Sequence, residues 1–304
     1  MLTKNGCHFN REASNGETPL YLACKNGHIN VARILVELGV DCHEPVADST
    51  LLHAAAGSCH YDIVCWLVDV GVSVDVIDAS GFTAMHIASR DNAMETKDVA
   101  IWLDSIGADI TCVNEEDGLT ALHRACMMED VALAEWLLSR NPDFIKRRAV
   151  DDKSPLSVAV LSCNDELVDL CERYIMDGTD EDTALDEIRD DIIDLLGIAM
   201  QEEDFSAAPF MLQRLMLHTD PLYVFSDGST VLHFAAAIGD LEVLSYLLSH
   251  NAVVDARSHA QKTPLHYAAI TGEIKCAEKL INAGADCLAK DSSDRDIMQF
   301  AQYF

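Results

Sequence analysis

The fold of this 304-residue chain is decided by the stretch Thr263-Pro264-Leu265-His266-Tyr267-Ala268-Ala269, which Gly272 follows. Thr263 is a favourable N-cap, and Pro264 stands at the first helical position, where its missing N–H costs nothing. Leu265 and the two alanines share one face at helical spacing, and alanines let a neighbouring helix approach closely. Gly272 ends this helix and Gly284 ends a second, because glycine adopts the left-handed turn that helix ends favour. The stretch therefore predicts two short helices back to back.

The same pattern recurs along the chain. Its copies begin at Thr18, Thr50, Thr83, Thr120, Ser154, Thr230 and Thr263, so successive copies lie 32, 33, 37, 34, 76 and 33 residues apart. A period near 33 residues with a T-P-L-H-x-A core resembles the ankyrin-repeat family over nearly the whole chain. The resemblance implies an all-α solenoid of paired antiparallel helices. In such a solenoid a β-turn loop, here called a finger, precedes each threonine.

The spacings predict a single array over 1–304 with about eight repeats. These are expected near 14–46, 47–79, 80–116, 117–150, 151–178, 190–226, 227–259 and 260–292, with partial repeats at 1–13 and 293–304. The long spacing predicts that 190–226 is degenerate, with Asp194 capping its first helix, and that 177–190 is an acidic insertion. Because the array starts and stops within a repeat, we expect the chain to be an excerpt of a longer protein.

Composition limits where such a chain acts. No basic segment followed by an apolar core opens the sequence, and no apolar run reaches the ~18 residues that span a bilayer. None of the eleven cysteines forms a C-x-x-C pair, and Cys24, Cys126 and Cys276 occupy small apolar helix slots. This usage predicts reduced core thiols in a cytoplasmic or nuclear protein, with no direct membrane insertion.

The chain has twelve histidines, which could indicate a metal-binding site, but their positions disfavour one. His53, His86, His123, His233 and His266 stand at one motif position, a repeat apart, which is too far for them to share an ion with ligands at ~2 Å. In arrays that this chain resembles, the equivalent histidine bonds the finger of its own repeat and of the next. No phosphate-binding glycine loop or nucleophile elbow is present either. We therefore expect no metal, no cofactor and no catalytic residue, and hence no enzyme.

The resemblance places partner contacts on the fingers and on the last residues of each first helix. In the third and fourth repeats, the candidate contacts are Phe82, Arg90, Asp91, Glu116, Asp117, Leu119, Met127 and Met128. A second candidate group further along is Phe234, Ile238, Tyr267 and Ile270. Within the first group an unusually apolar patch is formed by Phe82, Leu119, Met127 and Met128, and methionine suits an adaptable binding surface. The alternative is that these apolar residues cover an insertion loop of the same chain.

The chain carries 21 Lys and Arg against 51 Asp and Glu, a net charge of −30. An acidic patch is predicted at Asp180, Glu181, Asp182, Asp186, Glu187, Asp190 and Asp191. We expect that segment to fold over the basic cluster Lys146, Arg147, Arg148 and Lys153, since like-charge repulsion would otherwise keep it extended. Phosphate-rich partners, namely nucleic acids and anionic membranes, are disfavoured by this charge. It favours a basic protein partner, unless the acids serve only solubility.

Two functions stay open on the sequence. The first is a monomeric, non-catalytic scaffold or adaptor that binds a basic, partly extended protein segment in its concave groove. The second is a structural or regulatory ankyrin region of a larger enzyme, channel or pathogen effector.

Overall fold

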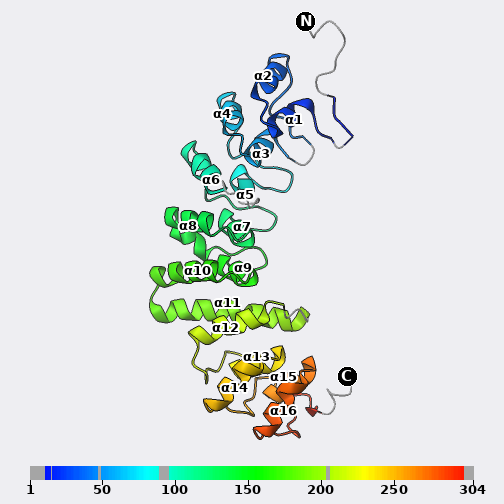
Figure 1. Cartoon of the computed structure of the whole chain (residues 1–304), viewed down its shortest axis with the longest axis vertical. Helices are drawn as coiled ribbons and strands as arrows, with labels where there is room; N and C mark the ends of the chain where they lie inside the picture. The colour runs from blue at the N-terminus through cyan, green and yellow to red at the C-terminus, as the bar shows by residue number, and fades with distance from the viewer. Residues whose placement is uncertain (1–10, 15, 47–48, 89–95, 203–205, 298–304) are drawn as a thin grey trace. The chain divides into compact units, whose positions relative to one another are not determined.

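The computed structural model describes residues 11–14, 16–46, 49–88, 96–202 and 206–297. In these ranges the chain folds into short helices joined by turns, with β-structure limited to isolated bridges such as Val113 with Thr120 (Figure 1). The expected all-α architecture of ankyrin repeats is confirmed. The repeat boundaries themselves stay a prediction, and most of both partial terminal repeats lies outside the described residues.

The chain divides into two compact units, Met1–Ile175 and Met176–Phe304, here called the N-terminal and C-terminal units. The first contains α1 (Pro19–Lys25), α2 (Ile29–Glu37), α3 (Leu51–Ala56), α4 (Tyr61–Asp69), α5 (Ala84–Ala88), α6 (Thr96–Ser105), α7 (Ala121–Met127), α8 (Val131–Arg140), the 3-10 helix η2 (Pro142–Lys146), α9 (Pro155–Leu161) and most of α10 (Asp165–Gly178). The second contains α11 (Glu181–Glu202), α12 (Ala208–His218), α13 (Val231–Ile238), α14 (Leu241–Ser249), α15 (Pro264–Thr271) and α16 (Ile274–Asn282).

Within each unit the first helices of successive pairs pack on one another. In the N-terminal unit α1, α3, α5, α7 and α9 form this inner row, and in the C-terminal unit α13 packs on α15. The motif leucine of the inner helices, replaced by Met85 in α5, forms the core. Leu20, Leu52, Leu122, Leu156, Leu232 and Leu265 are all at most 1% exposed. Stacking of identical faces thus buries what one helix pair leaves open.

The motif threonine starts its helix as the sequence predicts. The Thr120 hydroxyl accepts a hydrogen bond from the His123 N–H at 3.4 Å, while the Thr120 N–H donates to His123 Nδ1 at 3.2 Å. Together these bonds form a capping box that satisfies both backbone donors. Equivalent boxes begin α13 and α15.

Where histidine stands at the motif position, it links its repeat to the next, as expected for His53, His86, His123 and His233. His53 Nε2 lies 2.8 Å from the Phe82 carbonyl oxygen, and His123 Nε2 lies 3.2 Å from that of Lys153. In His123, Nδ1 accepts from a backbone N–H and so carries no proton, which leaves Nε2–H to donate to the carbonyl. Burial lowers the pKa of His123, which favours this neutral form.

The cysteines are free thiols throughout the described ranges. Cys24, Cys126 and Cys276 are buried in helices, as their apolar slots predict. Burial raises the pKa of the Cys24 thiol to about 12 and that of Cys276 to about 11. These thiols therefore stay protonated and behave as small apolar core residues.

One expectation for the acidic segment is wrong. Residues 181–202 form the single helix α11, so Asp194 lies inside a helix rather than at its start. The apolar residues Ala184, Ile188, Ile192 and Leu195 recur at helical spacing and are buried, and α11 packs on α12. Burial of that face outweighs like-charge repulsion on the opposite one. Asp180 is the capping residue, since its carboxylate accepts from the Thr183 N–H at 3.1 Å.

Candidate functional site

Two neighbouring fingers of the N-terminal unit, 114–119 and 149–153, are joined through their backbones. The Val150 N–H donates to the Asp117 carbonyl oxygen at 2.9 Å. Gly118, which follows Asp117 in the chain, has a φ of +72°, and a Cβ placed on it would lie 2.8 Å from the Val150 nitrogen. Only glycine allows both the left-handed backbone and this close approach. The fingers are therefore fixed side by side, and the groove between them has a defined width.

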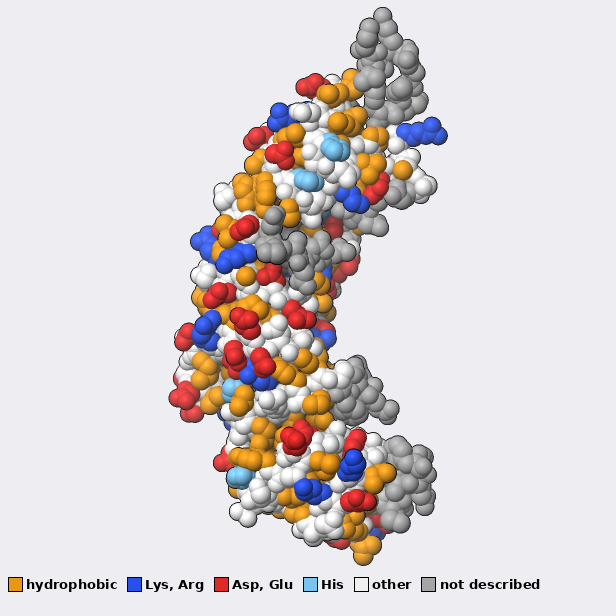
Figure 2. Space-filling view, in the orientation of Figure 1, with side chains coloured by type: hydrophobic (Ala, Val, Ile, Leu, Met, Phe, Trp, Pro, Cys, Tyr) orange, Lys and Arg blue, Asp and Glu red, His pale blue; other side chains and the backbone are white. Residues whose placement is uncertain are grey.

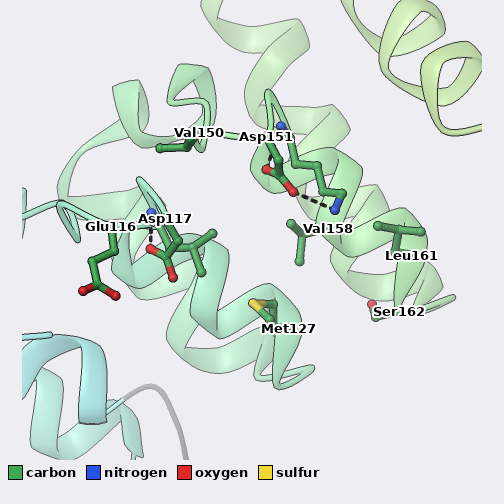
Figure 3. Close-up of a pocket in the computed structure, with 10 residues that line it drawn as sticks. Glu116, Asp117, Met127, Val150, Asp151, Val158, Leu161 and Ser162 are labelled. Atoms are coloured by element: carbon green, nitrogen blue, oxygen red, sulfur yellow. Dashed lines mark hydrogen bonds and ion pairs between the residues drawn. The ribbon is translucent and has the colours of Figure 1, made fainter. Parts of the chain in front are cut away.

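A pocket of about 600 Å³ opens between these two fingers and the helices behind them (Figure 3). It is lined by Glu116, Asp117, Leu119, Met127, Val150, Asp151, Lys153, Val158, Leu161 and Ser162. Met127, at the end of α7, lies across the pocket from Val158 and Leu161 of α9. Its volume falls in the ~300–1,000 Å³ range of ligand pockets.

The pocket exists because one side chain is short. In the preceding repeat, the Arg124 guanidinium lies over the Phe82 ring at 3.9 Å and covers it. Val158 stands at the position of α9 that Arg124 occupies in α7, four residues after the motif Thr or Ser. Because valine does not reach as far as arginine, Leu119 remains open to the groove, where Leu119 and Val158 line the same pocket. The size of the side chain at this repeated position thus determines whether the pocket is open.

Charge surrounds the apolar lining. Glu116, Asp117 and Asp151 contribute three carboxylates against the single ammonium of Lys153. Lys153 Nζ lies 2.7 Å from Asp151 Oδ2, and this hydrogen bond is the main cause that holds the pKa of Asp151 below its usual range. Asp117 Oδ1 accepts from the Leu119 N–H at 3.0 Å, which shapes the tip of its finger. An apolar side chain with a neighbouring cation fits this lining best.

The structure brings together four of the first group of predicted contact residues, Glu116, Asp117, Leu119 and Met127. The Met127 side chain is 47% exposed, so it is open to a partner. Phe82 lies in the neighbouring groove, where Arg124 covers it, and Met128 is half-buried at the C-cap of α7. Arg90 and Asp91 lie outside the described residues.

The second group divides between core and surface. Phe234 is 5% exposed and packs at 5.6 Å, edge to face, on Phe225, so it belongs to the core and offers a partner little surface. Tyr267 is half-buried with its ring against His233 at 5.2 Å, and Ile238 is also half-buried. Ile270, which is 37% exposed, is the most open of the four.

The acidic patch is also divided. Glu181, Asp182, Asp186, Glu187 and Asp190 are exposed on α11, whereas Asp191 is 5% exposed and belongs to its buried face. Partial burial, followed by repulsion from Asp186 and Asp194, raises the pKa of Asp190. Arg189 pairs with Asp186 at 2.9 Å and lies over the Tyr223 ring at 4.9 Å. Figure 2 shows acidic side chains over the visible face, with hydrophobic ones between them.

Sequence reasoning missed the second wall of the pocket, formed by Val150, Asp151, Lys153, Val158, Leu161 and Ser162. For all of these except Val158 the signal was available, since they occupy in the fifth repeat the finger and helix-end positions singled out in the fourth. A small group of possible metal ligands was also missed, at Asp41, Cys42 and His43, whose ligand atoms lie within 4.8 Å of one another. Burial raises the pKa of the Cys42 thiol, which disfavours the thiolate that a metal would need.

Comparison with family models identifies the family of the chain. A model described as "Ankyrin repeats (3 copies)" matches residues 1–78 and 196–291, and another, "Ankyrin repeats (many copies)", matches residues 90–138. The chain belongs to the ankyrin-repeat family. Ankyrin repeats mediate protein–protein interactions, and a groove between neighbouring fingers suits that role.

Similar proteins carry such repeats within much longer chains. The human "Transient receptor potential cation channel subfamily A member 1" is 24% identical over 97% of this chain and 30% of its own length. "E3 ubiquitin-protein ligase KEG" of Arabidopsis thaliana is 26% identical over 95% of this chain and 18% of its own length. "Potassium channel AKT2/3" of the same plant is 28% identical over 43% of this chain and 16% of its own length. The chain thus spans less than a third of each of these relatives.

Across the described ranges, none of the helices combines the length and the apolar character needed to cross a bilayer.

Proposed function

We propose that this ankyrin-repeat chain is a non-catalytic protein-interaction array that binds a basic, partly extended protein segment in its groove. The observation that carries the proposal is the pocket between the fingers 114–119 and 149–153, with an apolar lining and three carboxylates around it. The fingers are fixed by the Val150–Asp117 backbone bond, so a partner meets a preformed surface. Preformed sites lose less entropy on binding than sites that must first order.

The charge of the chain supports a basic partner. With 51 acids against 21 Lys and Arg, the field around the chain attracts cationic segments and raises their association rate. Charge alone gives little specificity, because exposed ion pairs contribute only ~0–1 kcal/mol each. Specificity would come from the apolar residues of the pocket, above all Met127 and Leu119.

The test is a selection of random peptides of about 12 residues, displayed on phage and panned on the full chain. Selected peptides are then titrated against the wild type and against Val158→Tyr, in which the larger ring fills the pocket. Tyrosine is compatible with the scaffold, because Tyr267 stands at the equivalent position of α15. We expect an excess of Lys and Arg in the selected peptides and at least a tenfold weaker affinity for Val158→Tyr.

The matched control is Ile270→Asp, which alters the exposed helix-end residue of the second candidate group. It should leave affinity within about twofold. Equal binding to the wild type and to Val158→Tyr would exclude the pocket, and loss of binding in Ile270→Asp would move the site to α15. Circular dichroism of each variant confirms that the helices are intact.

A second function is favoured by the relatives, which hold their similar segments within channels and ubiquitin ligases. Under it, the array would be a structural or regulatory region of such a larger protein, and the groove would need no separate ligand. Failure of the library to yield any peptide that depends on the pocket would favour this alternative.

A further inference from the structure

The ion pair between Lys153 and Asp151 stands at the edge of the pocket, and both residues line it. Lys153 Nζ lies 2.7 Å from Asp151 Oδ2, and both side chains are open to solvent. Exposed pairs of this kind are weak and exchange readily with other partners. The Lys153 ammonium is therefore held at the Asp151 carboxylate by an ion pair that another cation can replace.

The backbone of Lys153 is held much more firmly than its side chain. Its carbonyl oxygen accepts from the Ala149 N–H at 2.9 Å and lies 3.2 Å from His123 Nε2. These two bonds fix the end of the finger and join it to the fourth repeat. The side chain is thus free to move from Asp151 while the finger keeps its shape.

We infer that Lys153 acts as an internal substitute for a partner's cation, and that it leaves Asp151 when a segment with an apolar side chain beside a Lys or Arg binds. This inference rests on the proposed function and specifies the ligand of its pocket. The apolar side chain enters between Met127 and Leu161, and the adjacent cation replaces the Lys153 ammonium at Asp151. Glu116 and Asp117 add negative charge on the opposite finger, which favours a cationic over an acidic segment.

The exchange provides selectivity. A segment that is only apolar gains contacts with the lining but none with the charge of Asp151. A segment that carries its own cation takes the place of Lys153 at Asp151 and is also attracted by Glu116 and Asp117. The free lysine then returns to solvent, where an ammonium is well hydrated.

The experiment compares Lys153→Ser with Lys146→Ser, using one peptide selected on the wild-type chain that contains an apolar residue next to Arg. Both substitutions remove one positive charge from a lysine in or near the same finger, but Lys146 is exposed and does not line the pocket. We expect Lys153→Ser to tighten binding about three- to tenfold and Lys146→Ser to change it by less than twofold. Equal effects of the two variants would reduce the result to general electrostatics and overturn the inference.

A double-mutant cycle with Asp151→Asn gives the second measurement. Asparagine keeps an acceptor for the Lys153 N–H but removes the charge, so affinity should fall about fivefold or more. In that background Lys153→Ser should bring no further gain, because the competing pair no longer exists. A gain that persists without Asp151 would contradict the exchange.

The outcomes separate this inference from the function on which it rests. Peptides that depend on Val158 but carry no basic residue, and that ignore Lys153→Ser, would leave the pocket as a binding site and refute the cation exchange. Selection of acidic peptides that lose affinity in Lys153→Ser would make Lys153 the receptor for an anion, which also refutes it. Absence of any Val158-dependent peptide would refute the proposed function itself.

Discussion

The groove of the N-terminal unit between fingers 114–119 and 149–153 has a counterpart in the C-terminal unit between fingers 225–229 and 258–262. Their backbones agree. The Val150 N–H donates to the Asp117 carbonyl at 2.9 Å, and the His259 N–H donates to the Asp227 carbonyl at 2.6 Å. Gly118 and Gly228 have φ values of +72° and +78° at the same turn. The frame of the two grooves is thus one structure repeated.

The side chains on that frame differ. At the end of the first helix, Met127 is 47% exposed, whereas Ala237 at the equivalent position is 1% exposed. At the position four residues after the motif Thr or Ser, Val158 lines an open pocket, whereas Tyr267 directs its ring against His233. Cap and turn residues therefore determine the scaffold, and two or three positions per repeat determine whether the groove is open.

The largest expected effect tests whether the motif leucine contributes equally to the separate cores of the two units. Leu122 and Leu232 stand at one motif position and are at most 1% exposed, so each change to Ala should destabilise its region by ~2–5 kcal/mol. Because repeats couple to their neighbours, Leu122→Ala should reduce hydrogen-exchange protection in α5 to α9 and leave α15 unchanged. Leu232→Ala should reduce protection near α13 and leave α5 to α9 unchanged. Hydrogen-exchange mass spectrometry measures both. Uniform loss of protection along the chain in either variant would contradict the comparison.

A smaller effect is expected where the fingers touch. Gly118→Ala places a Cβ 2.8 Å from the Val150 nitrogen, in addition to the strain of a left-handed backbone. Gly39 is the matched control, because its φ is +93° but nothing lies within 4 Å of a Cβ there. Gly39→Ala should cost ~1–2 kcal/mol, the backbone strain alone. Gly118→Ala should cost clearly more and weaken peptide binding, as urea unfolding and titration would reveal. Equal costs would show that the fingers can separate freely.

Sequence and structure agree wherever repetition carries the information. The motif threonines, leucines and histidines predicted helix starts, core and links between repeats, because each role depends on neighbours at fixed spacing. Glu116, Asp117, Leu119 and Met127 were found by the same repetition. What repetition could not give was the shape of the space between two repeats, which depends on how far Arg124, Val158 or Tyr267 extends. The prediction from sequence was wrong for α11, because no other part of the chain repeats this segment. The charge of the segment was considered there without the apolar face that the helix buries.

The last and smallest effect concerns pH, and it compares two repeats within the N-terminal unit. His123 and Ser157 occupy the same motif position, but only the histidine titrates near neutrality. Burial lowers the pKa of His123 in the folded chain below the ordinary value of ~6.5. The unfolded chain therefore binds the proton first as pH falls. The stability from the neutral histidine is fully present above ~6.5 and is lost as pH falls toward and through the folded pKa.

His123→Ser copies the fifth repeat, where the Ser154 and Ser157 hydroxyls lie 3.2 Å apart. We expect this variant to be less stable at pH 7.5, since it loses the bond to the Lys153 carbonyl, but to lose less stability than the wild type between pH 7.5 and 5.5. Local exchange of α7, corrected for the intrinsic rate at each pH, measures the difference, and α15, which belongs to the C-terminal unit, serves as the internal reference. Carboxylates titrate mainly below this window, and those that do not are common to both proteins, so the difference isolates the histidine. An identical pH dependence in the two proteins would show that protonation of His123 does not oppose folding.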